Sequence, residues 1–192
     1  MTDLDRLSDQ EGIFLLSLAR ITIEKELFHT TDTDLDNSHV SPKMNEKRGT
    51  FVTLTTNKNL RGCIGNIIPH EPLIKGIRHN AINAAFHDPR FRPLSKNEWE
   101  NVKIEVSILT EPKELSYSDV DDLLEKLRPE IDGVIIKKGL RQSTFLPQVW
   151  EQLPDKKEFL THLCLKAGLD KDAWKSEDLN VSIYQVQAFD EK

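Results

Sequence analysis

The chain has 192 residues, of which 38% are hydrophobic and 30% are charged, and its formal net charge is −6. This balance is typical of one globular domain or two closely packed lobes, and the acidic charge argues against general binding to nucleic acid or to anionic membranes. The cysteines, Cys63 and Cys164, are too few for a disulfide framework, and we interpret them as free thiols in a reducing compartment.

The first predicted element is a helix that begins after Ser8, which has the spacing of a capping box with Glu11. The polar segment 30–46 is predicted to be a loop. It resembles a calcium loop only weakly, because the glycine and the distal glutamate of an EF-hand are missing, so we interpret it as a solvated acidic loop. Its alternating acidic residues are Asp32, Asp34 and Asp36.

A β-hairpin is predicted next. Residues 50–55 are β-branched and aromatic, Asn57-Lys58-Asn59 supplies turn residues, and residues 60–68 return as a second strand that contains Gly62 and Gly65.

A second helix is expected to open near Pro72, which fits a first helical turn, and to end at His87-Asp88-Pro89. A short helix with a Ser95–Glu98 capping box follows. Residues 102–108 then alternate strictly between apolar and polar, which predicts a strand.

The C-terminal part mixes helices and strands without βαβ regularity. Its predicted elements are a helix capped by Ser118, a hairpin of strands 133–137 and 142–146, a helix at 158–166 that Gly168 ends, and a closing strand at 181–189. This order favours an α+β fold with mixed or antiparallel sheets over a parallel doubly wound sheet.

Four groups of motifs span most of the chain. They are Leu60-Arg61-Gly62-Cys63-Ile64-Gly65; the run AAFHDPRFRPL from Ala84 to Leu94; the run IEVSIL from Ile104 to Leu109; and FLPQV at 145–149 with CLKAGL at 164–169. In this order they resemble the AMMECR domain family, the protein-A component of the AmmeMemoRadiSam system. The resemblance implies a single AMMECR domain over residues 1–192, with a larger lobe, a smaller lobe and a cleft between them. It also implies action with Memo-like and radical SAM proteins.

Cys63 is the leading candidate for chemistry. It lies between Gly62 and Gly65, where the backbone can approach a ligand closely. Arg61 is two residues away, so on a strand it shares the face of Cys63, and a nearby cation favours the thiolate. The alternative is that Cys63 is a small buried packing residue and Arg61 part of a fixed ion pair, since free cysteine is among the most buried residue types.

A second group of candidates follows the second predicted helix. His87 could serve a thiol as a general base, with Asp88 orienting it or acting itself. The simpler interpretation makes Asp88 a turn former before Pro89 and Arg90 a fork that holds a carbonyl or a carboxylate.

Glu105 and Ser107 lie on the polar face of the strand at 102–108. They would line a ligand site with Arg61 and Cys63 if the two strands are neighbours. The alternative is a solvent-facing stripe, which antiparallel sheets commonly have.

No metal or cofactor is expected. The cysteines and histidines have no zinc spacing, and the chain has no phosphate loop, no dinucleotide fingerprint and no three-cysteine cluster motif. The N-terminal residues carry no signal-peptide stretch, and no apolar run approaches the length of a membrane span, so we expect a cytoplasmic protein.

These features favour a cleft-bearing binding or adaptor module, and the resemblance implies that it acts with Memo-like and radical SAM partners. Its cleft, lined by Arg61, Cys63, Asp88 and Arg90, would hold a small anionic group or a partner's peptide. The main alternative is a cysteine-dependent enzyme with Cys63 as nucleophile and an acid–base partner from Asp88, His87 or Glu105. A third, nucleic-acid modification, fits a radical SAM association but not the net charge of −6.

Overall fold

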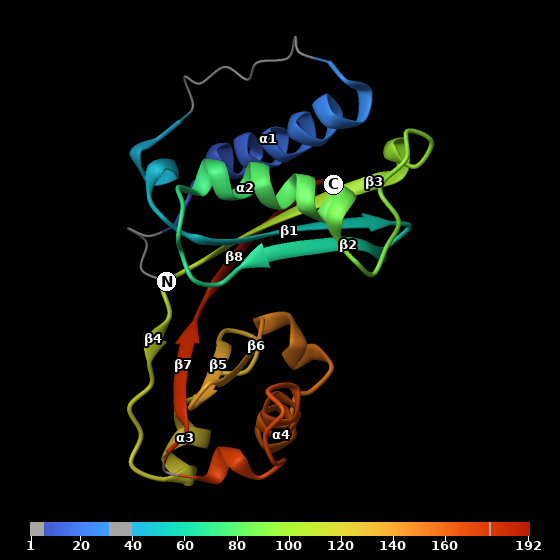
Figure 1. Ribbon diagram of the computed structural model, residues 1–192. Coiled ribbons are helices and arrows are strands. Elements are labelled where there is room, and N and C mark those ends of the chain that lie inside the picture. The colour runs from blue at the N-terminus through green and yellow to red at the C-terminus, as the bar shows by residue number, and fades with distance from the viewer. Residues whose placement is uncertain (1–5, 31–39, 177) are drawn as a thin grey trace. The chain divides into compact units, whose positions relative to one another are not determined.

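Figure 1 shows the computed structural model of the chain, which describes residues 6–30, 40–176 and 178–192. The three aspartates predicted to alternate in the acidic loop lie outside these ranges. Within them, no helix is both long enough and apolar enough to cross a membrane.

The backbone divides into two compact units. The first is Met1–Glu111 with Gln187–Lys192, and the second is Pro112–Val186. Each holds a four-stranded sheet and helices, so the predicted α+β class is confirmed. The cleft and the close packing of two lobes in a single domain stay predictions.

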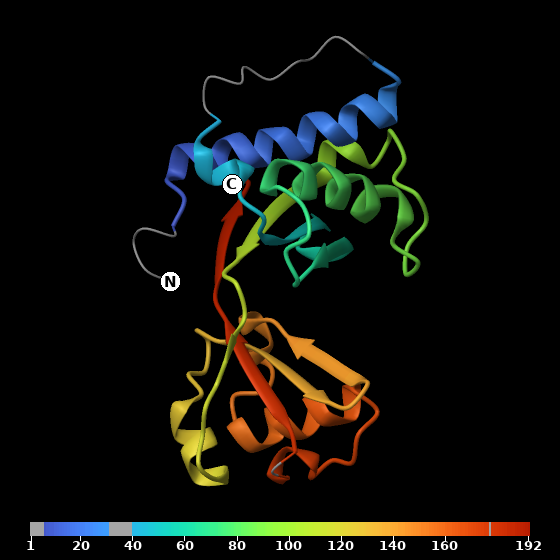
Figure 2. The same cartoon turned by 60° about the vertical axis from the view of Figure 1, so that its left-hand side comes forward.

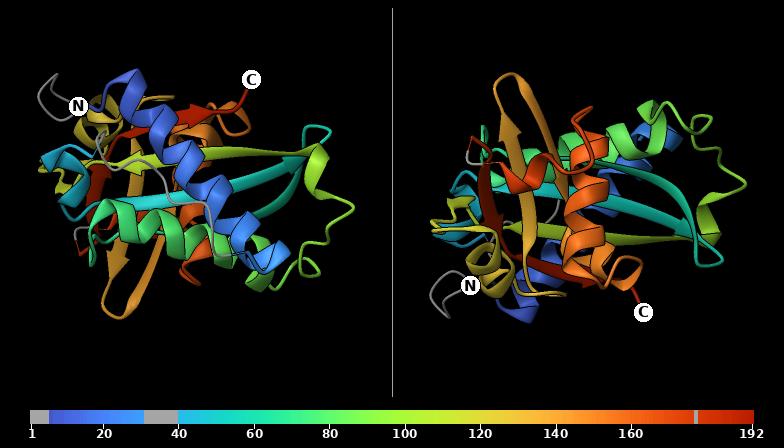
Figure 3. Two further views of the ribbon diagram at one scale, coloured as in Figure 1. Left: turned by 90° about the horizontal axis from the view of Figure 1, so that it is seen from above. Right: turned by 90° about the horizontal axis from the view of Figure 1, so that it is seen from below.

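The sheet of the first unit has the strand order β2-β1-β3-β8, with β1 antiparallel to both of its neighbours. Helices α1 and α2 lie together over one face of this sheet (Figures 1 and 3). The elements are α1 (Asp9–Phe28), η3 (Pro42–Asn45), β1 (Gly49–Thr56), β2 (Asn59–Asn66), α2 (Leu73–Ile82), the π-helix η4 (Asn83–His87), η5 (Trp99–Asn101), β3 (Val102–Leu109) and β8 (Val186–Asp190).

Local signals in the sequence explain how these elements begin and end. Ser8 and Glu11 form the predicted capping box of α1. The β1–β2 hairpin turns at Asn57 and Lys58, both with positive φ, as a tight hairpin turn requires. Helix α2 passes into the π-helix η4, which ends at His87 as predicted.

The core of the first unit lies between its helices and its sheet. Alternate residues of β1 and β3, such as Val52, Leu54, Ile104 and Val106, point toward the helices and are at most 1% exposed. The residues between them, such as Thr53, therefore point to the opposite face.

The second unit has the strand order β4-β7-β5-β6. Its core lies between this sheet and helices α3 and α4 (Figure 2). The elements are β4 (Lys113–Glu114), α3 (Val120–Lys126), β5 (Gly133–Lys138), β6 (Arg141–Phe145), η6 (Pro147–Glu151), α4 (Lys156–Lys166), η7 (Ala173–Lys175) and β7 (Asn180–Tyr184).

Two predictions in this part of the chain were wrong. The N-cap of α3 is Asp119, whose side chain accepts from the Asp122 amide, and not Ser118. The expected strand 181–189 is two strands in different sheets, β7 beside β5 and β8 beside β3. The left-handed Gly168 after α4 was predicted correctly, and its φ is 69°.

Candidate functional site

Several predicted site residues share the face of the first sheet that points away from α1 and α2. The register places Thr53 of β1 directly between Cys63 of β2 and Glu105 of β3. Neighbouring strands lie about 4.8 Å apart, so the Cys63 and Glu105 backbones are roughly 10 Å from each other. We call the residues Thr53, Arg61, Cys63, Glu105 and Ser107 the polar face.

The next row of this face is tightly packed around Phe51. Phe51 pairs with Gly65 on one side and Ser107 on the other. A Cβ atom on Gly65 would come within 2.3 Å of the Phe51 ring, so the glycine makes room for that ring. The Ser107 hydroxyl donates to Glu105 at 3.1 Å, which links the two predicted residues of β3.

The backbone of Cys63 is held from outside the sheet by two side chains. β2 is an edge strand, so its outer N–H and C=O groups have no neighbouring strand. The Cys63 N–H donates to Asp88 at 2.9 Å, and the Cys63 carbonyl accepts from Arg90 at 3.0 Å. We call Asp88 and Arg90 the edge clamp, because together they take the place of a further strand.

Asp88 is fully occupied by this role. Its carboxylate accepts hydrogen bonds from the Cys63 amide and from the Arg90 amide, Nε and Nη2, at 2.6–3.1 Å. Its side chain is only 1% exposed. The hydrogen bonds from Arg90, followed by the one from Cys63, hold the pKa of Asp88 well below its ordinary value. Four acceptor positions are about all that a carboxylate has, so none is left to receive a proton from a substrate.

The Cys63 thiol has a hydroxyl neighbour. Thr53 Oγ1 donates to Cys63 Sγ at 3.3 Å across the β1–β2 pair. The pKa of Arg90 is raised, chiefly by its hydrogen bonds to Asp88. His87 is exposed at the end of η4, and no hydrogen bond joins it to Cys63 among the residues described. A hydroxyl donor and a cation therefore lie beside Cys63, and no base among the described residues is hydrogen-bonded to its thiol.

Arg61 is held by a carboxylate that the sequence analysis did not select as a site residue. Its Nε donates to Glu98 Oε1 at 2.8 Å, and its Nη2 donates to the Arg92 carbonyl at 2.9 Å. Arg61, and then Ser95, lower the pKa of Glu98 to about 2. Nη1 of Arg61 is buried without a hydrogen-bond partner in the described part of the chain. The sequence analysis assigned Glu98 only to a capping box with Ser95. That box is not formed, because η5 begins after Glu98, which is its N-cap and makes no side-chain cap hydrogen bond.

Gly62 is the point where η4 meets β2. A Cβ atom at this position would lie 2.1 Å from the backbone oxygen of Ala84, which cannot move aside as a flexible side chain can. The close approach brings the end of η4, and hence Asp88, to the Cys63 amide. The predicted site glycines thus contact groups of the protein itself.

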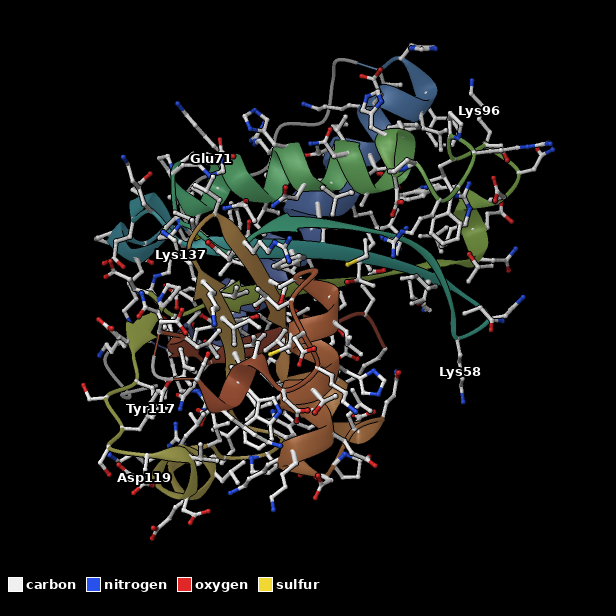
Figure 4. The ribbon with its side chains drawn as sticks, turned by 60° about the horizontal axis from the view of Figure 1, so that its bottom comes forward. Lys58, Glu71, Lys96, Tyr117, Asp119 and Lys137 are labelled. Atoms are coloured by element: carbon white, nitrogen blue, oxygen red, sulfur yellow. The ribbon has the colours of Figure 1, made fainter. Side chains whose placement is uncertain are left out.

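Two cavities in the described part of the chain lie away from these residues. One of about 460 Å³ in the second unit is lined by Tyr117 and Trp174, among others, and Figure 4 labels Tyr117 beside α3. Another of about 620 Å³ in the first unit is lined by Ile13 and Arg20, among others. No group of three or more His, Cys, Asp or Glu side chains in the described ranges has a metal-binding arrangement.

Comparison with known proteins places the chain among its relatives. The AMMECR1 family model matches residues 16–189. Protein MK0488 of Methanopyrus kandleri is 40% identical, over 98% of this chain and 92% of its own length. Protein MJ0810 of Methanocaldococcus jannaschii is 40% identical, over 96% of this chain and 92% of its own.

The fold also has a match among solved structures. The crystal structure of the uncharacterized protein PH0010 from Pyrococcus horikoshii is similar with a TM-score of 0.85 and 36% identity, over 97% of this chain and 94% of that one. Family model, sequence relatives and fold agree along nearly the whole length. The chain therefore belongs to the AMMECR1 family.

Proposed function

We propose that this AMMECR1-family protein is a binding or adaptor module that acts with Memo-like and radical SAM partners. Its polar face holds a small anionic group or a segment of a partner. The partner classes come from the family resemblance, and the choice of a binding role comes from the geometry around Cys63.

The observation that carries the binding role is the saturated carboxylate of Asp88. A cysteine nucleophile needs a base that removes its proton or a group that protonates the leaving atom. Asp88 stands closest to Cys63 in the hydrogen-bond network, yet it binds a backbone amide and the Arg90 guanidinium. Glu105 is separated from Cys63 by Thr53. The network fixes the backbone of β2 at Cys63, and it leaves Cys63 without a free carboxylate to act as its acid or base.

The preference for an anionic or carbonyl-bearing ligand rests on Arg61. An unpaired N–H of a buried guanidinium costs free energy, and a ligand oxygen that displaces the groups covering Nη1 would remove that cost. Because Glu98 and Arg92 fix the other side of the guanidinium, the unpaired Nη1 keeps one direction. A carboxylate, a phosphate or a peptide carbonyl each supplies such an oxygen.

Direct binding to purified partners tests the proposal. Isothermal titration calorimetry with the Memo-like and radical SAM proteins of the same organism should give saturable binding to at least one. Thr53→Asp adds a negative charge to the polar face, which repels an anionic group, and should weaken that binding at least about tenfold. Thr30→Asp, the same change at an exposed residue after α1, is the matched control and should bind as the wild type does. Absence of binding by the wild-type protein would refute the adaptor role.

A cysteine-dependent enzyme is the second candidate, and the surroundings of the thiol favour it. Thr53 donates to Cys63 Sγ, and the Arg90 guanidinium, a cation, donates to the carbonyl of the same residue. The test is the rate of alkylation by iodoacetamide against pH, followed by mass spectrometry. Cys164 is the internal control, because it is fully buried and burial raises the pKa of its thiol.

The alkylation result separates the two candidates. Rapid modification of Cys63 well below the ordinary thiol pKa of about 8.5 would support the enzyme. A Cys63 that reacts only when Cys164 also reacts, on unfolding, would exclude nucleophilic catalysis and leave the binding role.

A further inference from the structure

The second unit carries an apolar side chain that nothing covers. Leu140 lies at the tip of the β5–β6 hairpin, which is visible in Figure 2, and its relative exposure is 104%. This is the highest value among the exposed large hydrophobic residues of the described chain; the next, Ile68, is 64% exposed. A side chain this exposed adds no burial to the fold.

The turn does not require leucine at this position. Lys138 and Arg141 close the hairpin as a pair, and only Gly139 and Leu140 connect them. Gly139 has a φ of 59°, which glycine accepts without strain. The second position of such a two-residue turn favours short polar residues that bond locally. Leu140 therefore has no explanation in the stability of its own hairpin.

The hairpin is basic although the chain is acidic. Residues 133–146 hold three basic side chains and no acidic one, in a chain with a net charge of −6. Lys137, labelled in Figure 4, and Arg141 are both exposed beside the turn. A leucine with two flanking cations matches an apolar depression with an acidic rim.

The tip is held in place on both sides. Lys138 bonds Asp178 at 2.7 Å and the Ser176 hydroxyl at 3.0 Å. On the returning strand, the Arg141 guanidinium donates to the Gly168 carbonyl. A tip fixed before binding loses little conformational freedom when it docks.

We infer that Lys137, Leu140 and Arg141 form a docking tip, which inserts Leu140 into an apolar pocket on the acidic surface of a partner protein. The inference rests on the proposed adaptor function and names a contact surface for it. A protein pocket fits better than a lipid surface, because one leucine and two cations anchor a protein to a membrane only weakly. A pocket with an acidic rim buries the leucine and pairs both cations at once.

The test measures binding of the wild-type protein, Leu140→Ser and Ile131→Ser to the purified Memo-like and radical SAM proteins by calorimetry. Ile131 is 49% exposed elsewhere in the second unit, so Ile131→Ser is a matched loss of exposed apolar surface. We expect Leu140→Ser to weaken binding at least about tenfold. Ile131→Ser should bind within about twofold of the wild type. The melting temperature of Leu140→Ser should equal that of the wild type, because the side chain packs against nothing.

Each remaining outcome overturns the inference in a distinguishable way. If Leu140→Ser binds as tightly as the wild type, the docking tip is wrong and the adaptor function stands. If the wild type binds neither partner, both proposals fail. If vesicles of phosphatidylserine and phosphatidylcholine bind the wild type but not Leu140→Ser, while the proteins bind both alike, the tip contacts membrane and not a partner protein.

Discussion

The carboxylate of Asp88 accepts the backbone N–H of Cys63, 25 residues earlier in the chain, at 2.9 Å. This bond joins the Leu60–Gly65 motif to the Ala84–Leu94 motif. Arg90 closes the link from the other side by donating to the Cys63 carbonyl. The two motifs therefore depend on each other. The Leu60–Gly65 motif forms the edge strand, and the Ala84–Leu94 motif holds that strand in place.

The edge clamp should contribute measurably to stability. Asp88→Ala removes the acceptor of the Cys63 amide and leaves Arg90 without its carboxylate, so we expect a loss of about 3 kcal/mol in the free energy of unfolding. Urea denaturation at neutral pH measures it. Glu26→Ala, an exposed carboxylate of α1, is the control and should change stability by less than about 0.5 kcal/mol.

The same bond predicts a pH dependence. Because Arg90 and Cys63 lower the pKa of Asp88 in the folded state, its contribution is present above the ordinary carboxyl pKa of about 3.9 and is lost as pH falls below it. The stability difference between the wild type and Asp88→Ala should therefore shrink in acid. A difference that stays constant across that range would contradict the ionised clamp.

Gly62→Ala should be far more damaging than an alanine at an open glycine. The added Cβ would meet the Ala84 carbonyl oxygen at 2.1 Å, so η4 must move away from β2, at an expected cost of at least about 3 kcal/mol. At Gly139 the space around an added Cβ is open, and only the φ of 59° disfavours alanine. We therefore expect Gly139→Ala to lower the free energy of unfolding by about 1 kcal/mol. Thermal unfolding of both variants checks the order, and equal losses would show that η4 gives way freely.

Glu98→Gln should remove part of the acid sensitivity of the first unit. Arg61 lowers the pKa of Glu98 from 4.5 to about 2, so the contribution of the carboxylate is present above pH 4.5 and disappears as pH falls through about 2. Its side chain is 39% exposed, and solvent screening limits the effect to about 1 kcal/mol. Denaturation curves recorded across this range should converge for wild type and variant at the acid end.

Tyr184→Phe tests the core of the second unit at alkaline pH. Burial raises the pKa of Tyr184 to about 12, so its contribution is present below its ordinary pKa of 10 and is lost as pH rises through about 12. The variant also leaves the Phe145 carbonyl without the tyrosine hydroxyl, which we expect to cost about 1–2 kcal/mol at neutral pH. The wild-type advantage should be constant up to about pH 10 and should decline between pH 10 and about pH 12. If the stability difference between wild type and variant does not depend on pH, the Tyr184 hydroxyl has the same pKa in the folded and unfolded states.

Local features of the fold could be read from the sequence, because short-range chemistry determines them. The Ser8–Glu11 capping box, the hairpin turn at Asn57 and Lys58 and the left-handed Gly168 each depend on a few adjacent residues. The division of the segment 181–189 between two sheets could not be predicted. The alternation of apolar and polar residues is the same whichever sheet a strand joins. Pairing with strands that are distant in the sequence determines which sheet it is.

At the candidate site, too, the long-range contacts could not be predicted from the sequence. The sequence placed Arg61 and Cys63 on one strand, but it could not show that Thr53 faces the thiol, which depends on the β1–β2 register. Nor could it show that Glu98 binds Arg61, 37 residues away, because the spacing from Ser95 already gave Glu98 a role in a capping box. Long-range partners of charged residues follow from the fold, which a single sequence does not display.

The edge clamp has a counterpart in the second unit. Lys166 donates to the Thr144 carbonyl of β6, the edge strand of that sheet, at 2.9 Å. Both carbonyls lie where a strand of another molecule would add to the sheet, and in each case a cationic side chain already occupies the acceptor. At β2 and β6 these contacts hinder the addition of a strand from another molecule, a route that leads to aggregates when edge strands are left open.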